Sequence, residues 1–69
     1  MKARVRKKLQ RAGFSVIRKY SATRGGKQVK VICRVTEDGK LRILERYDTK
    51  EQRNAAFEKM LESETLIAG

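Results

Sequence analysis

Few residues in this chain are of the types that carry out catalysis. It has no histidine and a single cysteine, Cys33, in the middle of an alternating apolar run. Acid–base catalysis near neutral pH most often uses histidine, and a thiol without an activating neighbour is a weak nucleophile. All eight carboxylates follow residue 36, where they fit turns, a helix cap and a helix surface. We expect no enzyme, no metal site and no cofactor, with Cys33 an inert core thiol.

The excess of positive charge says more about the function than the few candidate catalytic residues do. The chain has 18 Lys and Arg against 8 Asp and Glu, a net charge of +10 and a pI near 10.4. Residues 1–36 hold twelve of the basic side chains and no acidic one. An excess of this kind indicates an anionic partner, most often nucleic acid.

The length and composition limit the architecture. We expect 69 residues to form one small domain, and a chain of this size buries only about 60% of its unfolded surface. One cysteine cannot form an intrachain disulfide. No apolar run is long enough for a signal peptide or a membrane span, so we expect no membrane partner and a cytoplasmic or nucleoid-associated protein.

The spacing of apolar residues predicts an α+β fold in the order α-β-β-β-α. We expect a basic helix over 2–12 that docks through Val5 and Leu9, a three-stranded antiparallel meander over 14–47, a C-terminal helix over 48–64, and a tail over 65–69 that is frayed or used in packing. Both helices are predicted to pack on one face of the sheet.

Turn and cap residues mark the boundaries. Gly25-Gly26 predicts a tight reversal, and Glu37-Asp38-Gly39 predicts a three-residue loop with Gly39 left-handed. Asp48 or Thr49 is the expected cap of the second helix, with Glu51 or Gln52 completing a capping box.

The three-residue loop determines a register for the last two strands. It pairs Val35 with Leu41 and Cys33 with Ile43, and it predicts that the second helix covers the face of Val29, Val31, Cys33 and Val35. Arg18, Glu45 and Arg53 fit this arrangement badly, and we place them at the rim, where Glu45 could pair with Arg53; an incorrect register is the alternative.

The uncovered face is then a candidate binding surface. It would carry five cations around Ile17, Ile32 and Leu44, namely Lys19, Lys30, Arg34, Arg42 and Arg46. Two directly opposed like-charge pairs would result, Lys30 with Arg46 and Arg34 with Arg42. Such pairs cost a few tenths of a kcal/mol, which bound phosphates would offset. The alternative is a solvated face on which long cationic stems cover apolar surface.

Two further basic elements are candidates for phosphate contacts. The exposed side of the first helix carries Arg4, Lys7, Lys8 and Arg11, and the Gly25-Gly26 turn is flanked by Arg24 and Lys27. Their alternative is again an ordinary solvated surface.

The aromatic residues favour contacts to a nucleic-acid backbone over base stacking. Phe14, Tyr20, Tyr47 and Phe57 all fall at positions expected to be in the core. Proteins that bind single strands usually stack bases on exposed rings. We therefore expect binding to a duplex through its phosphates.

The predicted element order resembles two nucleic-acid-binding families. Residues 49–56, Thr-Lys-Glu-Gln-Arg-Asn-Ala-Ala, resemble the second-helix start of the double-stranded-RNA-binding domain, although that family's Lys-Lys-x-Ala-Lys segment and its Gly-Pro-x-His loop are absent. Three strands set against a C-terminal helix also resemble the arm-binding domains of tyrosine recombinases. The first resemblance implies duplex RNA as the ligand, and the second implies a sheet face in the major groove of DNA.

The sequence thus predicts a small nucleic-acid-binding protein that contacts phosphates through a basic sheet face and a basic N-terminal helix, on DNA or duplex RNA. The alternative is a basic protein-interaction module that docks on an acidic protein surface, such as a phage- or mobile-element-encoded inhibitor or assembly factor. The choice between DNA and RNA and the oligomeric state stay open.

Overall fold

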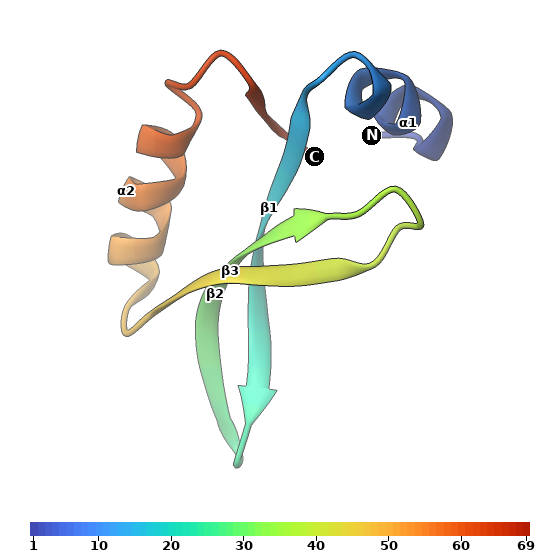
Figure 1. The fold of residues 1–69 in the computed structure, drawn as a ribbon. Coiled ribbons are helices and arrows are strands. Elements are labelled where there is room, and N and C mark those ends of the chain that lie inside the picture. The colour runs from blue at the N-terminus through green and yellow to red at the C-terminus, as the bar shows by residue number, and fades with distance from the viewer.

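The computed structural model describes all of residues 1–69 and contains a four-stranded sheet and two helices. The elements are α1 (Ala3–Arg11), β1 (Ser15–Arg24), β2 (Lys27–Val35), β3 (Leu41–Tyr47), α2 (Lys50–Met60) and β4 (Leu66–Ala68) (Figure 1). The strand order in the sheet is β3-β2-β1-β4. The predicted α+β class and the antiparallel meander β1-β2-β3 are confirmed.

Glycines set both hairpin turns. Gly25 and Gly26 have φ of +58° and +79°, which is the two-residue turn that matches the twist of a hairpin. In the second hairpin the amide of Thr36 donates to the carbonyl oxygen of Lys40 at 2.8 Å, and Gly39 has φ of +85°. The predicted three-residue loop with a left-handed Gly39 is therefore confirmed.

A β-bulge divides the pairing of β2 with β3. On the loop side the predicted pairs are present, with Val35 opposite Leu41 and Arg34 opposite Arg42. The register shifts between Ile32 and Cys33, and beyond the shift Ile32 lies opposite Glu45. The predicted pairs of Lys30 with Arg46 and of Ile32 with Leu44 are therefore wrong. One extra residue in β3 reverses its alternation of faces relative to β2.

Helix α2 covers the face of the sheet that we expected to be open. Phe57 of α2 forms the buried cluster with Ile17 and Ile32, and the partly buried side chains around them are those of Tyr47, Ala56, Met60, Leu61 and Leu66. The predicted packing against Val29, Val31, Cys33 and Val35 is wrong. The bulge is the physical reason, because it places Tyr47 opposite Lys30, on the Ile32 side, shortly before α2 begins.

The C-terminal tail forms a strand that sequence patterns did not predict. β4 pairs with β1 in parallel, with Ser15 opposite Leu66 and Ile17 opposite Ala68. The Leu66 side chain packs against the buried cluster under α2. Three residues are too few to show an alternation of their own, and the pairing only becomes possible once α2 returns the chain to β1.

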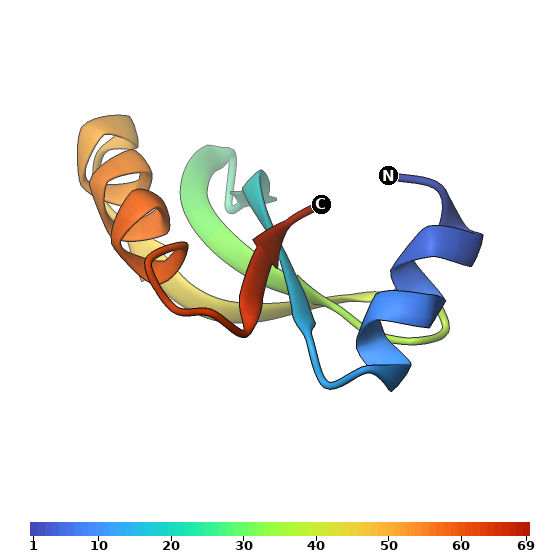
Figure 2. The same ribbon diagram turned by 90° about the horizontal axis from the view of Figure 1, so that it is seen from above.

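Helix α1 is attached to the sheet by polar contacts. Its Gln10 side-chain amide donates to the Val35 carbonyl oxygen at 2.7 Å, and the Arg6 guanidinium donates to the Glu37 carbonyl oxygen at 3.3 Å. No residue of α1 is buried, and Val5, predicted to dock the helix, is 45% exposed, whereas Leu9 is half-buried. Figure 2 shows α1 and α2 on opposite sides of the strands, so the helices do not share one face.

Candidate nucleic-acid interface

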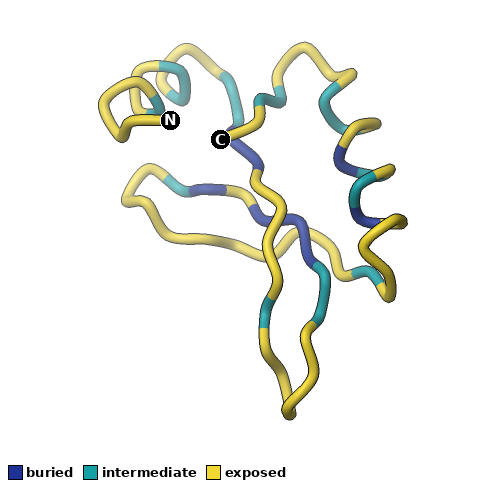
Figure 3. The backbone as a smooth tube through the Cα atoms, turned by 180° about the vertical axis from the view of Figure 1, so that it is seen from behind, coloured by how far each residue is buried: buried dark blue, intermediate teal, exposed yellow.

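The sheet presents a second face, opposite the one that α2 covers, and we call it the open face. Strand registers place Arg18 and Tyr20 on it from β1, in line with Cys33 and Val31 of β2. Its centre is buried, as the tube coloured by burial shows for β2 (Figure 3). The exposed members of the open face are Arg18, Tyr20, Arg24, Lys27, Leu41, Ile43 and Arg46.

No strand residue on the open face is acidic. The only carboxylate within the strands belongs to Glu45, which the bulge places opposite Ile32, on the α2 side. Four cations therefore share this face with no charge of opposite sign among them. This is the arrangement that an anionic polymer would complete by charge pairing.

The predicted set of five sheet cations is divided between the two faces. Arg46 lies on the open face, because it is paired with Val31 beyond the bulge. The other four lie on the α2 side and are Lys19, Lys30, Arg34 and Arg42.

Two of these α2-side cations have contacts within the chain. The Nζ of Lys19 lies 5.3 Å from the centroid of the Phe57 ring, within the range of a cation–π interaction. Lys30 donates from its Nζ to the Gln28 Oε1 at 3.4 Å. Both lysines are therefore engaged near the helix–sheet junction and contribute less to a free basic surface.

Arg34 and Arg42 form a separate basic patch at the end of the β2–β3 hairpin. They are directly paired across the strands, as predicted, and both are exposed. Arg34 lines two surface recesses of about 310 and 480 Å³, and Arg42 shares the larger one. Asp38 also lines the larger recess, and a hydrogen bond from the Thr36 hydroxyl lowers the pKa of its carboxyl. This patch is therefore less purely cationic than the open face.

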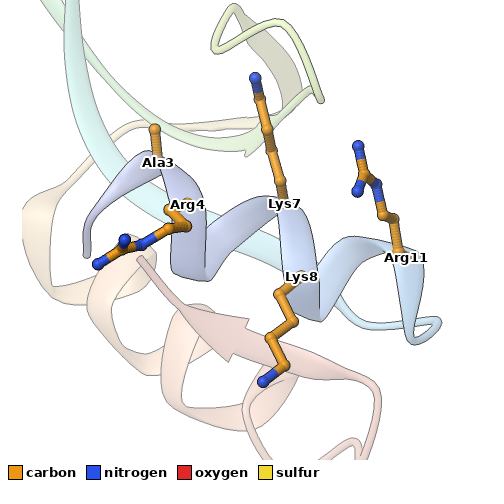
Figure 4. Close-up of a pocket in the computed structure, with 5 residues that line it drawn as sticks. All are labelled: Ala3, Arg4, Lys7, Lys8 and Arg11. Atoms are coloured by element: carbon orange, nitrogen blue, oxygen red, sulfur yellow. The ribbon is translucent and has the colours of Figure 1, made fainter.

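The predicted cations of α1 do lie together. Arg4, Lys7, Lys8 and Arg11 are exposed and line, with Ala3, an open recess of about 540 Å³. Figure 4 shows their side chains spreading from the helix in several directions, with Lys7 and Lys8 pointing oppositely. They form a band of charge along the helix and do not converge on one point. Such a band suits a polymer of phosphates better than a single small anion.

Sequence reasoning missed Arg18 and Tyr20 as candidate site residues. Tyr20 is 48% exposed on the open face, so its predicted core position is wrong, whereas Phe57 is buried and Phe14 and Tyr47 are half-buried. Arg18 could have indicated this, because it falls on the same strand face as Tyr20, which we expected to be buried. An arginine on that face is more consistent with a face that α2 does not cover.

Arg53 is a buried cation with no carboxylate partner. It is 7% exposed, and its Nη1 donates to the Tyr20 carbonyl oxygen at 3.0 Å, while its Nε donates to the Asn54 Oδ1 at 3.4 Å. The single ion pair in the chain joins Lys40 to Asp38, so the predicted pair of Glu45 with Arg53 is wrong. Arg53 instead fastens α2 to the backbone of β1 at the residue whose side chain stands on the open face.

The structure offers few features for thiol chemistry, metal binding or membrane insertion. Burial raises the pKa of the Cys33 thiol, which disfavours the reactive thiolate. The chain has no group of three or more side chains placed to hold a metal ion, and neither helix is long and apolar enough to cross a bilayer. Comparison with protein-family models, with curated proteins and with solved structures found no match to this chain.

Proposed function

We propose that this protein is a non-enzymatic nucleic-acid-binding module that contacts the phosphate backbone. The observation that carries the proposal is the open face, on which Arg18, Arg24, Lys27 and Arg46 are exposed and no carboxylate lies among them. The interface differs from the one expected from the sequence, because the bulge and α2 exchange the roles of the two faces.

The unpaired state of the cations supports the proposal. None of the four makes a hydrogen bond or an ion pair through its side chain within the chain. Repulsion among them is unrelieved in the free protein, and phosphates would relieve it while releasing condensed counterions. The strength of such binding would fall steeply with salt.

The basic band of α1 extends the same surface. α1 lies on the side of the sheet away from α2, as the open face does (Figure 2). Its nine residues include no acidic side chain, and Arg4, Lys7, Lys8 and Arg11 are exposed and can contact a ligand. In this proposal the open face supplies the central contacts and Arg4, Lys7, Lys8 and Arg11 supply peripheral ones.

The test compares two double variants with the same change in net charge. Arg18→Glu with Arg46→Glu reverses two open-face cations, whereas Lys50→Glu with Lys59→Glu reverses two exposed cations of α2. Fluorescence anisotropy would measure the affinity for duplex DNA, duplex RNA and single strands over a range of salt. The proposal expects the open-face variant to lose most of its affinity and the α2 variant to retain it.

The dependence on salt gives an independent measure of the phosphates contacted. The log–log slope is about 0.9 per phosphate for duplex DNA and about 0.7 for single strands. The open-face variant should lose the equivalent of about two phosphates from this slope. Equal losses in both double variants would mean that net charge alone drives binding and would contradict the proposed interface.

The outer edge of the sheet supports a second candidate function, docking on an acidic protein. β3 is an edge strand, and its Leu41, Ile43 and Leu44 side chains are exposed beside Arg42 and Arg46. An unpaired edge with apolar side chains can add a strand from another chain. The chain, freed of nucleic acid, would then form a stoichiometric complex with an acidic protein that Ile43→Lys disrupts and Tyr20→Leu does not.

A further inference from the structure

We infer that the ligand is single-stranded nucleic acid and that one of its bases stacks on the ring of Tyr20. This inference rests on the proposed function and specifies the form of nucleic acid that the open face would take. It reverses the preference for a duplex that the sequence suggested, because that preference depended on having no exposed aromatic ring.

The position of Tyr20 is the first support. Tyr20 is 48% exposed as a residue, whereas the residue opposite it on β2, Val31, is fully buried. The same-face neighbour toward the hairpin tip, Ala22, is small. About half of Tyr20 therefore faces solvent beside a small neighbour, so a base can reach its side chain.

The charges around the ring are the second support. Arg18 lies two residues before Tyr20 on the same face, so their Cα atoms are about 6.8 Å apart along β1. Arg46 is paired with Val31, the β2 residue opposite Tyr20, so its Cα lies about 10 Å from that of Tyr20 across the sheet. Cations on two sides of a ring are suited to hold the phosphates of a strand whose base lies on that ring. Ile43, which is also exposed, extends the apolar surface beside them.

The backbone at this position is held in place, which is the third support. Arg53 donates to the Tyr20 carbonyl oxygen at 3.0 Å and to the Ser21 hydroxyl at 3.4 Å. Because Arg53 belongs to α2, these hydrogen bonds tie the helix to the backbone of β1 at Tyr20. A ring on a fixed backbone loses less entropy when a base stacks on it.

A duplex cannot use this surface in the same way. Its bases are stacked on one another, so their flat faces are covered and only their edges and the phosphates can be reached. An exposed ring among cations adds nothing to duplex binding but adds stacking energy for an unpaired base. The open face should therefore prefer single strands over duplexes of the same sequence.

The chain offers a direct test, because it has no tryptophan and only two tyrosines. In a Tyr47→Phe variant, Tyr20 is the only tyrosine, so tyrosine emission reports on Tyr20 alone. Stacking of a base should quench its emission when a short oligothymidylate is added, after correction for absorption by the bases. An abasic strand of the same length carries the phosphates without the bases, and it should leave the emission unchanged.

Affinity measurements complete the test. Tyr20→Phe keeps the ring and should bind oligothymidylate within about two-fold of the parent, whereas Tyr20→Leu keeps apolar bulk alone and should bind about ten-fold more weakly. Neither change should alter affinity for the abasic strand. Circular dichroism and urea unfolding of both variants would verify that they are folded.

The outcomes separate this inference from the proposed function. If the protein binds nucleic acid but Tyr20→Leu binds as well as the parent, or Tyr20 emission is not quenched, or a duplex is preferred, the single-strand inference is overturned and the proposed function stands. If neither single strands nor duplexes bind at low salt, both are overturned.

Discussion

The Arg53 guanidinium on α2 donates a 3.0 Å hydrogen bond to the Tyr20 carbonyl oxygen on β1, whose side chain stands on the opposite face of the sheet. Helix α2, which contains both acidic and basic side chains, thus holds the backbone of the candidate site. The acid-rich half of the chain and its basic half are joined at this contact.

Loss of this contact should lower the stability of the fold. Arg53→Met keeps an apolar stem of similar bulk but removes the donors to Tyr20, Ser21 and Asn54. A hydrogen bond from a charged donor is worth about 1.5–3 kcal/mol, so we expect a loss of about 2 kcal/mol in urea unfolding. Lys59→Met, at an exposed position on the same helix, should change stability by less than about 0.5 kcal/mol.

The first turn of α2 depends on a capping box. The Thr49 hydroxyl accepts a hydrogen bond from the Gln52 amide at 3.1 Å, and the Gln52 side chain accepts one from the Thr49 amide at 3.3 Å. Thr49→Ala should destabilise the protein by about 1 kcal/mol, and Thr49→Ser, which keeps the acceptor, should cost much less. Thermal unfolding would measure both, and equal melting temperatures for the two variants would contradict the role of the cap.

Helix α1 should be the least stable element of the fold. It has nine residues, no side-chain cap, no acidic residue in its first turn and no buried residue, and isolated helices of that length are marginal in water. Two polar atoms at its contact with the sheet, the Arg6 Nε and the Gln10 Oε1, are buried without partners. Hydrogen exchange should therefore be faster for the amides of α1 than for those around Phe57.

Ligand binding should change this exchange pattern. Phosphates on the basic band would offset the repulsion along α1, so a saturating nucleic acid should slow exchange in α1 more than in α2. Slowing confined to the β-strands would mean that α1 makes no contact with the ligand. Exchange in the free protein that is equally slow in both helices would contradict the marginal stability of α1.

Alkaline pH should destabilise the protein through Cys33. Burial raises the pKa of its thiol above the ordinary value of 9.0, so the unfolded chain releases this proton at lower pH than the folded one. The stabilisation is complete below that ordinary value and is lost as pH rises through the folded-state pKa. Urea unfolding at about pH 8 and about pH 10 should show a smaller loss of stability for Cys33→Ala than for the parent.

A control separates this effect from that of Tyr47. Burial, and secondarily the charge of Glu45, raises the pKa of the Tyr47 hydroxyl, so this group also contributes at high pH. A Tyr47→Phe background removes its contribution. If Cys33→Ala has the same pH dependence as the parent in that background, Cys33 does not titrate differently in the folded and unfolded states.

Local features of this fold could be predicted because they depend on neighbouring residues. Glycine is needed where φ is positive, which identified the Gly25-Gly26 turn and the left-handed Gly39. The capping-box pattern limited the cap of α2 to Asp48 or Thr49, and the structure has it at Thr49 with Gln52. The division of charge along the chain likewise follows directly from composition.

Only the tertiary structure decided which face of the sheet binds α2 and which stays open. Alternation with a period of two assigns residues to the same face but does not say which face a helix will cover. The bulge at Ile32 and Cys33 depends on long-range pairing, and it brings Tyr47 to the Ile17 and Ile32 side, where Phe57 completes the cluster. That choice puts Tyr20 and Arg18 on the face that α2 does not cover, and both are exposed there.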